Sequence, residues 1–299
     1  MELSLPNANN NPIYMKDEDV PPMKWWKYVL IYSFVFVFII SIIIYTILLA
    51  DKDLTFLLEK FLNILTIGFI YYLNGRFLVQ KFKVKINYTR KINHFAIWVT
   101  PFLMDYLFDL EDSIIAAIWN IAFAFIGFVI LTIPIRRNDC SGILHTVYLS
   151  LDRPEDRPNT LNWLTTQNIL TGIVLTPFII LWNHWNKEDY KFIPLFIATF
   201  GDGFAEIIGV RFGKHKYKTT AWFTNKTYTR SYEGSSCVFI TGIIMICIFY
   251  KQFTTLQLIL NLTLIPLFTT ITEAYSPHTM DNPFIILISG GILSLVHYV

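Results

Sequence analysis

Residues 28–50 have the sequence YVLIYSFVFVFIISIIIYTILLA, which contains no charged side chain. About twenty consecutive apolar residues are enough for a helix to cross a bilayer, so this run predicts a membrane-spanning helix. The run is longer than the apolar part of a secretory signal, and the residues before it are polar and mixed in charge. We therefore expect a retained helix, with Trp25 and Trp26 as its aromatic anchor at the membrane interface.

Similar apolar runs recur along the chain. Of its 299 residues, 54% are hydrophobic and only 15% are charged, whereas about a quarter of the residues of a soluble domain are charged. This excludes a soluble protein and predicts an all-α polytopic membrane protein with about nine transmembrane helices. We expect a flexible tail at 1–26 and a single transmembrane domain at 27–299. The predicted spans are residues 28–50, 61–79, 95–108, 113–135, 164–183, 191–209, 235–250, 256–273 and 283–298.

Lys and Arg residues gather in alternate loops between these spans. Residues 81–91, 136–137 and 211–230 are rich in them, whereas 51–53 and 109–112 are mainly acidic. Short loops rich in Lys and Arg usually stay in the cytoplasm. A count of nine spans places all the basic loops on that side, so the N-terminus is expected to be cytoplasmic. The motifs described below then lie at the cytoplasmic face.

The chain has no pattern of a soluble nucleotide-binding domain. Neither the glycine pattern of a Rossmann fold nor a P-loop occurs. The three cysteines, Cys140, Cys237 and Cys247, show no spacing typical of a metal site or of a disulfide framework. Any chemistry must therefore be built from helix ends and loops. Among the predicted spans, the third is the weakest, because it is short and contains Asp105.

The segment 201–217, GDGFAEIIGVRFGKHKY, places two acidic residues inside an apolar run. Asp202 and Glu206 are four residues apart, so both carboxylates project from one face of a helix. Charged groups inside a membrane are costly and usually functional, and Mg²⁺ binds one or two carboxylates together with substrate phosphates. We expect both residues to be metal ligands. The alternative is a pair of polar packing contacts between helices that the glycines bring close together.

Basic and hydroxyl residues follow between 211 and 236. Hydroxyl groups and glycine amides at the start of a helix can bind anions, because the first N–H groups of a helix lack partners. Lys and Arg beside such a helix start are typical of a polyphosphate site. Cytoplasmic loops are basic in any case, which is the alternative explanation for part of this charge. The residues that we expect to bind phosphates here are Lys214, His215, Lys216, Lys218, Arg230, Ser231, Gly234 and Ser235.

The segment 273–283, EAYSPHTMDNP, closes the eighth predicted span. Asn282 followed by Pro283 predicts the N-cap and the first residue of the ninth helix. Glu273 and Asp281 are separated by a tight turn and could face each other as metal ligands. The alternative is an interfacial helix cap that binds no ligand.

A fourth polar group begins the third predicted span. Arg90 and His94 are four residues apart and Lys91 and His94 are three apart, so all three share one helix face. These residues are either part of a site or a basic flank whose side chains extend to the membrane interface. The sequence alone gives no preference between the two.

Together these segments resemble a known superfamily. They contain G-D-G-x-A-x-x-x-G-x-x-F-G at 201–213, R-S-x-E-G-S at 230–235, E-A-x-S-P-x-x-x-D-N at 273–282 and R-K-x-x-H at 90–94. These patterns are similar to those of the CTP-dependent lipid kinases, which include dolichol kinase, phytol and farnesol kinases and yeast-type diacylglycerol kinase. Phosphatidate cytidylyltransferase is related to this group. The likeness extends from about residue 88 to the end of the chain.

The resemblance implies an enzyme that uses CTP and Mg²⁺ on a lipid at the cytoplasmic surface. Asp202 would bind the metal, the segment 211–235 would hold the nucleotide, and Asp281 and Asn282 would complete the acidic side. Phytol-kinase-like members commonly have K-S-x-A-G-S, so the R-S-Y-E-G-S of this chain departs from that branch. Its Glu-Gly pair resembles the W-E-G of the cytidylyltransferases, yet their long C-terminal signature is absent.

We therefore expect phosphoryl transfer from CTP to the hydroxyl of an isoprenoid alcohol such as phytol, farnesol or dolichol. The alternatives are phosphatidate cytidylyltransfer and, more remotely, transport. We expect lipid and nucleotide partners, no nucleic acid, and leave a homo-oligomer open. The expected catalytic residues are Asp202, Glu233 and Asp281. Arg90 and Lys91 join the nucleotide-binding residues, and the expected metal ligands are Asp202, Glu206, Glu273, Asp281 and Asn282.

Overall fold

A computed structural model describes residues 24–48, 54–110, 114–132, 135–136, 141–157, 159–220 and 227–299. The predicted tail at 1–26 lies outside this part of the chain, apart from residues 24–26. Of the cysteines, Cys140 also lies outside it, whereas Cys237 is buried and Cys247 is exposed, both as free thiols.

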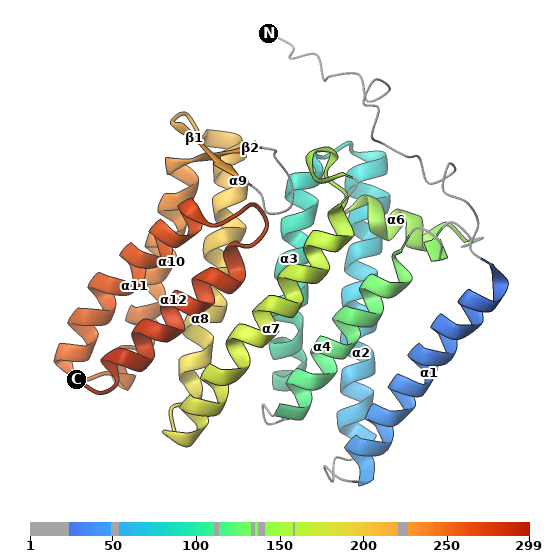
Figure 1. The fold of residues 1–299 in the computed structure, drawn as a ribbon, viewed down its shortest axis with the longest axis horizontal. Coiled ribbons are helices and arrows are strands. Elements are labelled where there is room, and N and C mark those ends of the chain that lie inside the picture. Colours follow the sequence, from blue (N-terminus) through green and yellow to red (C-terminus); the bar gives the residue numbers. More distant parts are fainter. Residues whose placement is uncertain are drawn as a thin grey trace.

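The described chain is mainly helical, with helices that run side by side between two levels (Figure 1). The elements of its first half are α1 (Trp25–Leu48), α2 (Leu54–Leu73) with a π-helical continuation (Asn74–Lys81), α3 (Ile86–Leu107), α4 (Ile114–Ile130), α6 (Ile143–Leu149) and a 3₁₀ turn (Pro154–Asp156).

The second half contains the remaining helices and a short hairpin between α9 and α10. Its elements are α7 (Thr160–His184), a 3₁₀ turn (Glu188–Lys191), α8 (Phe192–Phe196), a π-helical segment (Ile197–Gly201), α9 (Asp202–Phe212), β1 (Lys216–Thr220), β2 (Thr227–Ser231), α10 (Tyr232–Ile248), a 3₁₀ turn (Tyr250–Gln252), α11 (Thr255–Tyr275) and α12 (Asp281–Val296).

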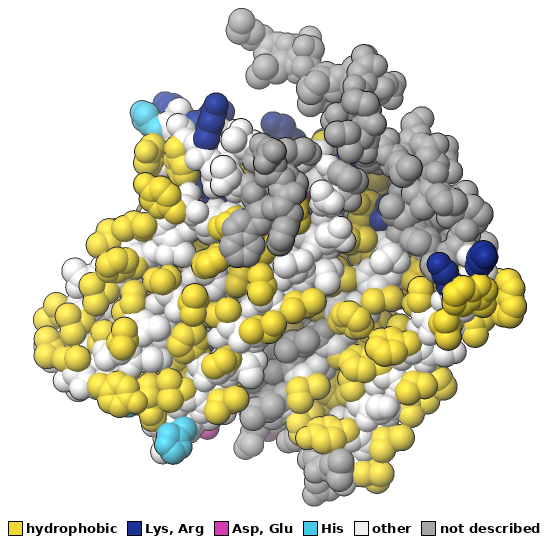
Figure 2. All heavy atoms as spheres, in the orientation of Figure 1, with side chains coloured by type: hydrophobic (Ala, Val, Ile, Leu, Met, Phe, Trp, Pro, Cys, Tyr) yellow, Lys and Arg dark blue, Asp and Glu magenta, His cyan; other side chains and the backbone are white. Residues whose placement is uncertain are grey.

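Each predicted span overlaps a helix or a continuous run of helices in the described part of the chain. Hydrophobic side chains cover most of the helical sides, whereas Lys and Arg lie at the end that carries the hairpin and beside the start of α1 (Figure 2). This pattern is compatible with embedding in a membrane. Within the described ranges, five segments are long and apolar enough to cross one: Trp25–Leu48, Leu54–Lys81, Thr160–His184, Glu188–Phe212 and Thr255–Tyr275.

The acidic residue of the third span has a buried partner. Oδ1 of Asp105 in α3 lies 2.7 Å from Nζ of Lys60 in α2, and Nζ of Lys60 also lies 2.8 Å from Oε2 of Glu59. A buried charge is tolerated when an opposite charge accompanies it. This pairing explains why an apolar helix contains Asp105 near its end away from the hairpin.

The hairpin is the main element that the sequence does not predict. Strands β1 and β2 are antiparallel, with Tyr217 opposite Arg230 and Thr219 opposite Tyr228 on one face. That face packs on the helix ends: the hydroxyls of Tyr217 and Ser235 are 2.7 Å apart, and Thr219 donates to the Ser276 carbonyl at 3.1 Å. The hairpin therefore covers the start of α10 and the turn between α11 and α12.

Candidate functional site

A cavity of about 790 Å³ lies beneath the hairpin, between the ends of α3, α7, α9, α10, α11 and α12. Four expected site residues, Lys214, His215, Lys218 and Glu233, are not among its lining residues. The expected site residues that do line it are Arg90, Lys91, Asp202, Glu206, Lys216, Arg230, Ser231, Gly234, Ser235, Glu273, Asp281 and Asn282.

Asp202 and Glu206 meet the basic start of α3. Nζ of Lys91 lies 2.6 Å from Oδ2 of Asp202 and 3.3 Å from Oε2 of Glu206, and Nη2 of Arg90 lies 2.7 Å from the same Glu206 oxygen. A π-helical segment ends directly before Asp202, and such segments are frequent at functional sites. The two carboxylates thus share a helix face, as their spacing predicts, and both contact cations from a distant segment.

Arg153 is a member of the site that the sequence analysis missed. Its Nη1 lies 2.7 Å from Oε1 of Glu206, and its Nε lies 2.6 Å from Oδ2 of Asp156. Asp156 in turn lies 2.9 Å from Nε2 of His278 in the turn between α11 and α12. The only local signal is the charged run 152–157, DRPEDR, which follows a short apolar segment. Arg153 therefore links the loop before α7 to α9 and to the α11–α12 turn.

Arg230 joins the hairpin to the acidic residues of α11 and α12. Its Nη1 lies 2.5 Å from Oε1 of Glu273, its Nη2 lies 3.4 Å from Oδ2 of Asp281, and it also donates to the Glu273 carbonyl. Ser235 donates to the other Glu273 oxygen at 2.6 Å. Glu273 and Asp281 therefore do lie close together, and both contact one partly buried guanidinium.

Ser231 and Gly234 form the start of α10. Ser231 is its N-cap, and its hydroxyl accepts from the Gly234 N–H at 3.1 Å. A Cβ atom at Gly234 would lie 2.7 Å from the carbonyl oxygen of Ala205 in α9. Only glycine allows the backbones of α9 and α10 to approach this closely, which brings the helix start of α10 to the cavity beside Asp202.

Gly234→Ala is expected to lower both the thermal stability and the activity of the protein. The added methyl group meets backbone atoms of α9, so the two helices must separate. The matched control is Gly291→Ala in α12, where a Cβ atom would meet nothing within 4 Å and where alanine improves helix propensity by about 1 kcal/mol. Thermal denaturation in detergent checks this, and equal midpoints for the two variants would contradict the close-approach argument.

His278 and Asp156 have shifted pKa values. Burial lowers the pKa of His278 below its ordinary value, although the hydrogen bond with Asp156 opposes this. Burial alone would raise the pKa of Asp156, yet the hydrogen bond with His278 and the charge of Arg153 outweigh it and lower the pKa to about 2. At neutral pH we therefore expect a neutral His278 beside an ionised Asp156.

These shifts predict that acidification destabilises the fold. Below pH of about 6.5 the unfolded chain protonates His278 while the folded chain does not, so stability falls. The contribution of Asp156 is lost only at lower pH, between about 4 and its folded pKa of about 2. Between pH 7 and 5, His278→Gln should therefore reduce the loss of thermal stability, whereas His184→Gln at the far end of α7 should not. If thermal stability falls with pH in His278→Gln as steeply as in the wild type, His278 is not the group responsible for this pH dependence.

The turn before α12 differs from the sequence prediction. The sequence predicts Asn282 as the N-cap, but α12 begins at Asp281 and Met280 is the N-cap, with no described side chain capping the helix. Pro283 is tolerated in the first turn because N–H groups there have no helical partner. Oδ1 of Asn282 and Oγ1 of Thr279 are buried without a hydrogen-bond partner among the described residues. Thr279 also has φ +68°, and such strain often marks functional sites.

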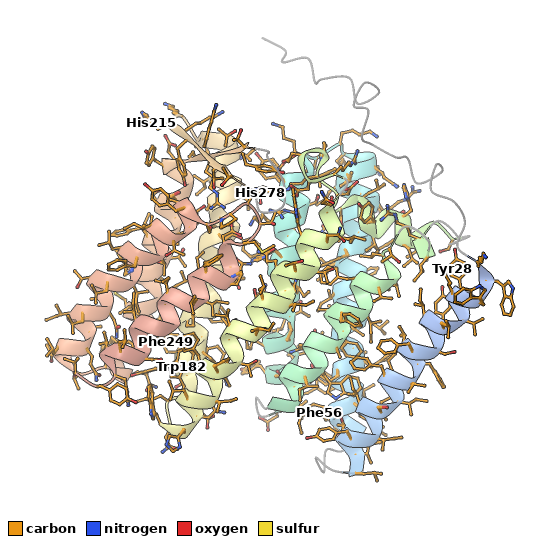
Figure 3. All side chains as sticks on the ribbon, in the orientation of Figure 1. Tyr28, Phe56, Trp182, His215, Phe249 and His278 are labelled. Carbon is orange, nitrogen blue, oxygen red and sulfur yellow. The ribbon has the colours of Figure 1, made fainter. Side chains whose placement is uncertain are left out.

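The expected residues outside the cavity lie at the outer side of the hairpin and, for Glu233, in the first turn of α10. Nδ1 of His215 lies 2.8 Å from Oε1 of Glu233, and the His215 side chain is 79% exposed. Figure 3 shows His215 at the outer edge of the hairpin, away from His278. Lys214 and Lys218 are exposed as well. These side chains therefore contribute charge near the site but do not line it.

The charges that line the cavity are balanced. Among the described lining residues, five basic side chains (Arg90, Lys91, Arg153, Lys216 and Arg230) face five acidic ones (Glu155, Asp202, Glu206, Glu273 and Asp281). No group of three His, Cys, Asp or Glu side chains in the described ranges could hold a metal ion by itself. A ligand that brings both a cation and an anion therefore suits this site better than either ion alone.

The chain was compared with known proteins in three ways. A scan against models of protein families, a search of curated proteins and a search of solved structures found no match.

Proposed function

We propose that the protein is a multi-pass membrane enzyme that transfers the γ-phosphoryl group of CTP to the hydroxyl of a membrane lipid alcohol, with Mg²⁺. An isoprenoid alcohol such as phytol, farnesol or dolichol is the proposed acceptor. The main support is that segments far apart in the chain contribute side chains to one cavity, namely 90–91, 202–206, 230–235 and 273–282. These are the segments in which the chain resembles the CTP-dependent lipid kinases.

The acidic residues suit a magnesium ion that arrives with the nucleotide. Mg²⁺ needs only one or two protein carboxylates when substrate phosphates complete its coordination. Asp202 and Asp281 both line the cavity, and Oδ1 of Asn282, which has no hydrogen-bond partner among the described residues, adds an oxygen. Glu206 and Glu273, which each contact a guanidinium group, would orient Arg90 and Arg230. The bound ion would offset charge on the transferring phosphoryl group.

The basic residues would bind the phosphate oxygens. Lys91, Arg153 and Arg230 are each held by carboxylates, so they are positioned before substrate binds. In the transfer, the acceptor oxygen forms a bond to the γ-phosphorus, and the bond from that phosphorus to the β,γ-bridging oxygen breaks. CDP leaves with the electron pair, and the hydroxyl proton passes to Asp202 or Asp281.

We further propose that nine helices cross the membrane and that the site faces the cytoplasm. The support is that the connections before α3 and between α9 and α10, both rich in Lys and Arg, lie at the same end of the bundle (Figure 1). Such connections usually remain in the cytoplasm. A site at helix ends also differs from the mid-membrane sites that are usual in transporters.

The test is to incubate purified protein with CTP labelled at the γ-phosphate, Mg²⁺ and a panel of lipids. Label in the lipid supports the kinase. Label in pyrophosphate instead identifies the alternative, in which phosphatidate attacks the α-phosphate and CDP-diacylglycerol forms. If the protein binds no CTP but carries a solute across liposome membranes, transport replaces both enzymatic proposals.

A further inference from the structure

The cavity that contains the charged site continues along the helices into the bundle. Its lining includes Ile97 and Trp98 from α3 and Phe128 from α4. Thr171 also lines it, about three turns after the start of α7, which corresponds to about 16 Å along the helix axis. We name the part lined by these four residues the apolar arm. A hydrocarbon chain suits such a lining because its burial there removes apolar surface from water.

His94 lies where the charged site meets the apolar arm. Arg90 and Lys91 lie about one turn before it on α3, Ile97 and Trp98 lie about one turn after it, and all five line the cavity. Nε2 of His94 is buried and has no hydrogen-bond partner among the described residues. A buried polar atom left without a partner costs about 1–3 kcal/mol, which a ligand that donates a hydrogen bond would recover.

A second polar side chain lies at a similar depth on the α7 side. Gln167 is about two turns into α7, is buried and lines the same cavity. No described residue forms a hydrogen bond with its side-chain amide. A hydroxyl group donates one hydrogen bond and accepts others, so it can serve an imidazole acceptor and an amide donor together.

We propose that the hydroxyl of the acceptor lipid binds between His94 and Gln167, and that its hydrocarbon chain lies in the apolar arm. This inference rests on the proposed function and adds the position and direction of the lipid. Before transfer the hydroxyl donates to Nε2 of His94 and accepts from the amide of Gln167, and for transfer the O–H rotates so that its proton passes to Asp202 or Asp281. It then lies about one helical turn from Lys91, whose partner Asp202 belongs to the proposed metal site.

The position of the lipid's hydrocarbon chain is tested by a binding experiment without nucleotide. Thr171→Trp fills the apolar arm, and Ile173→Trp is the matched control, because Ile173 is 62% exposed on the same helix. We expect farnesol to raise the thermal denaturation midpoint of the wild type and of Ile173→Trp, but not of Thr171→Trp. Equal stabilisation of all three proteins would overturn the proposal. Ile97→Trp is used in the same way if Thr171→Trp does not fold.

The place of the hydroxyl is tested by kinetics. His94→Phe keeps a ring and removes the nitrogen, and Ile92→Phe adds a ring on the exposed side of the same helix. We expect His94→Phe to raise KM for farnesol at least about tenfold, with KM for CTP unchanged, and Ile92→Phe to change neither. An unchanged KM for farnesol in His94→Phe would overturn this assignment. A wild type that transfers nothing from CTP would instead refute the proposed function, while the farnesol-binding experiment would still locate the lipid.

Discussion

Asp202→Asn is expected to reduce phosphoryl transfer from CTP at least about a hundredfold, the effect typical of losing one preorganised electrostatic contact in an active site. The substitution keeps the shape of the side chain and removes the charge that would bind Mg²⁺. Lys91 retains a partner, since its Nζ also lies 3.3 Å from Oε2 of Glu206. The fold should therefore survive, and the loss should appear in labelled-product formation at saturating Mg²⁺.

The matched control for this variant is Asp189→Asn. Asp189 lies in the 3₁₀ turn before α8, far from the hairpin end, and its Oδ2 accepts from Gln252 at 2.8 Å on the surface. Its substitution removes the same charge from the opposite end of the bundle and should leave the rate within about twofold. Wild-type activity in Asp202→Asn would remove the central residue of the proposed magnesium site.

Arg230→Met is expected to abolish activity and to lower the free energy of unfolding by about 3–5 kcal/mol, the typical effect of removing one partner of a buried ion pair. Burial alone would lower the pKa of Arg230, but the charges of Asp281 and Glu273 outweigh it and raise the pKa. The guanidinium therefore stays charged, and without it two carboxylates remain buried beside each other. The hairpin also loses its ion pair with Glu273 of α11.

Lys218→Met provides the control on the neighbouring strand. Lys218 was expected to bind the nucleotide, yet it is exposed on β1 and does not line the cavity. We expect a change in stability within about 0.5 kcal/mol, as for most surface substitutions, and only a small rise in KM for CTP. If Lys218→Met loses as much activity as Arg230→Met, the nucleotide contacts the outer face of the hairpin and the cavity is not its site.

The positions of the helices could be predicted from short stretches of sequence. The predicted spans 164–183 and 256–273 lie within α7 (Thr160–His184) and α11 (Thr255–Tyr275). In a membrane, backbone polar groups must be satisfied within the segment, so a long apolar run leaves the helix as the available structure. The four-residue spacing of Asp202 and Glu206 likewise follows from helix geometry alone.

Other features depend on residues distant in sequence and were missed. The segments 216–220 and 227–231 are polar and carry no alternating apolar pattern, so nothing local predicts that they pair as β1 and β2. Arg153 lies in a loop of charged residues, and this composition predicts only a solvent-exposed loop. Its contact with Glu206 arises because the first half of α9 lies beside that loop. The start of α12 at Asp281, before Asn282, also reflects packing in the tight turn.

Local composition thus determined which segments are helical. It also identified the polar side chains inside apolar runs, which need a partner or a function to be tolerated there. Packing decided which charges meet: Lys91 with Asp202, Arg153 with Glu206, and Arg230 with Glu273. The physical reason is how far apart in the sequence the interacting residues lie. Helix formation in an apolar run depends on residues about four positions apart, whereas an ion pair depends on side chains brought within a few ångströms by helices that the chain order does not place.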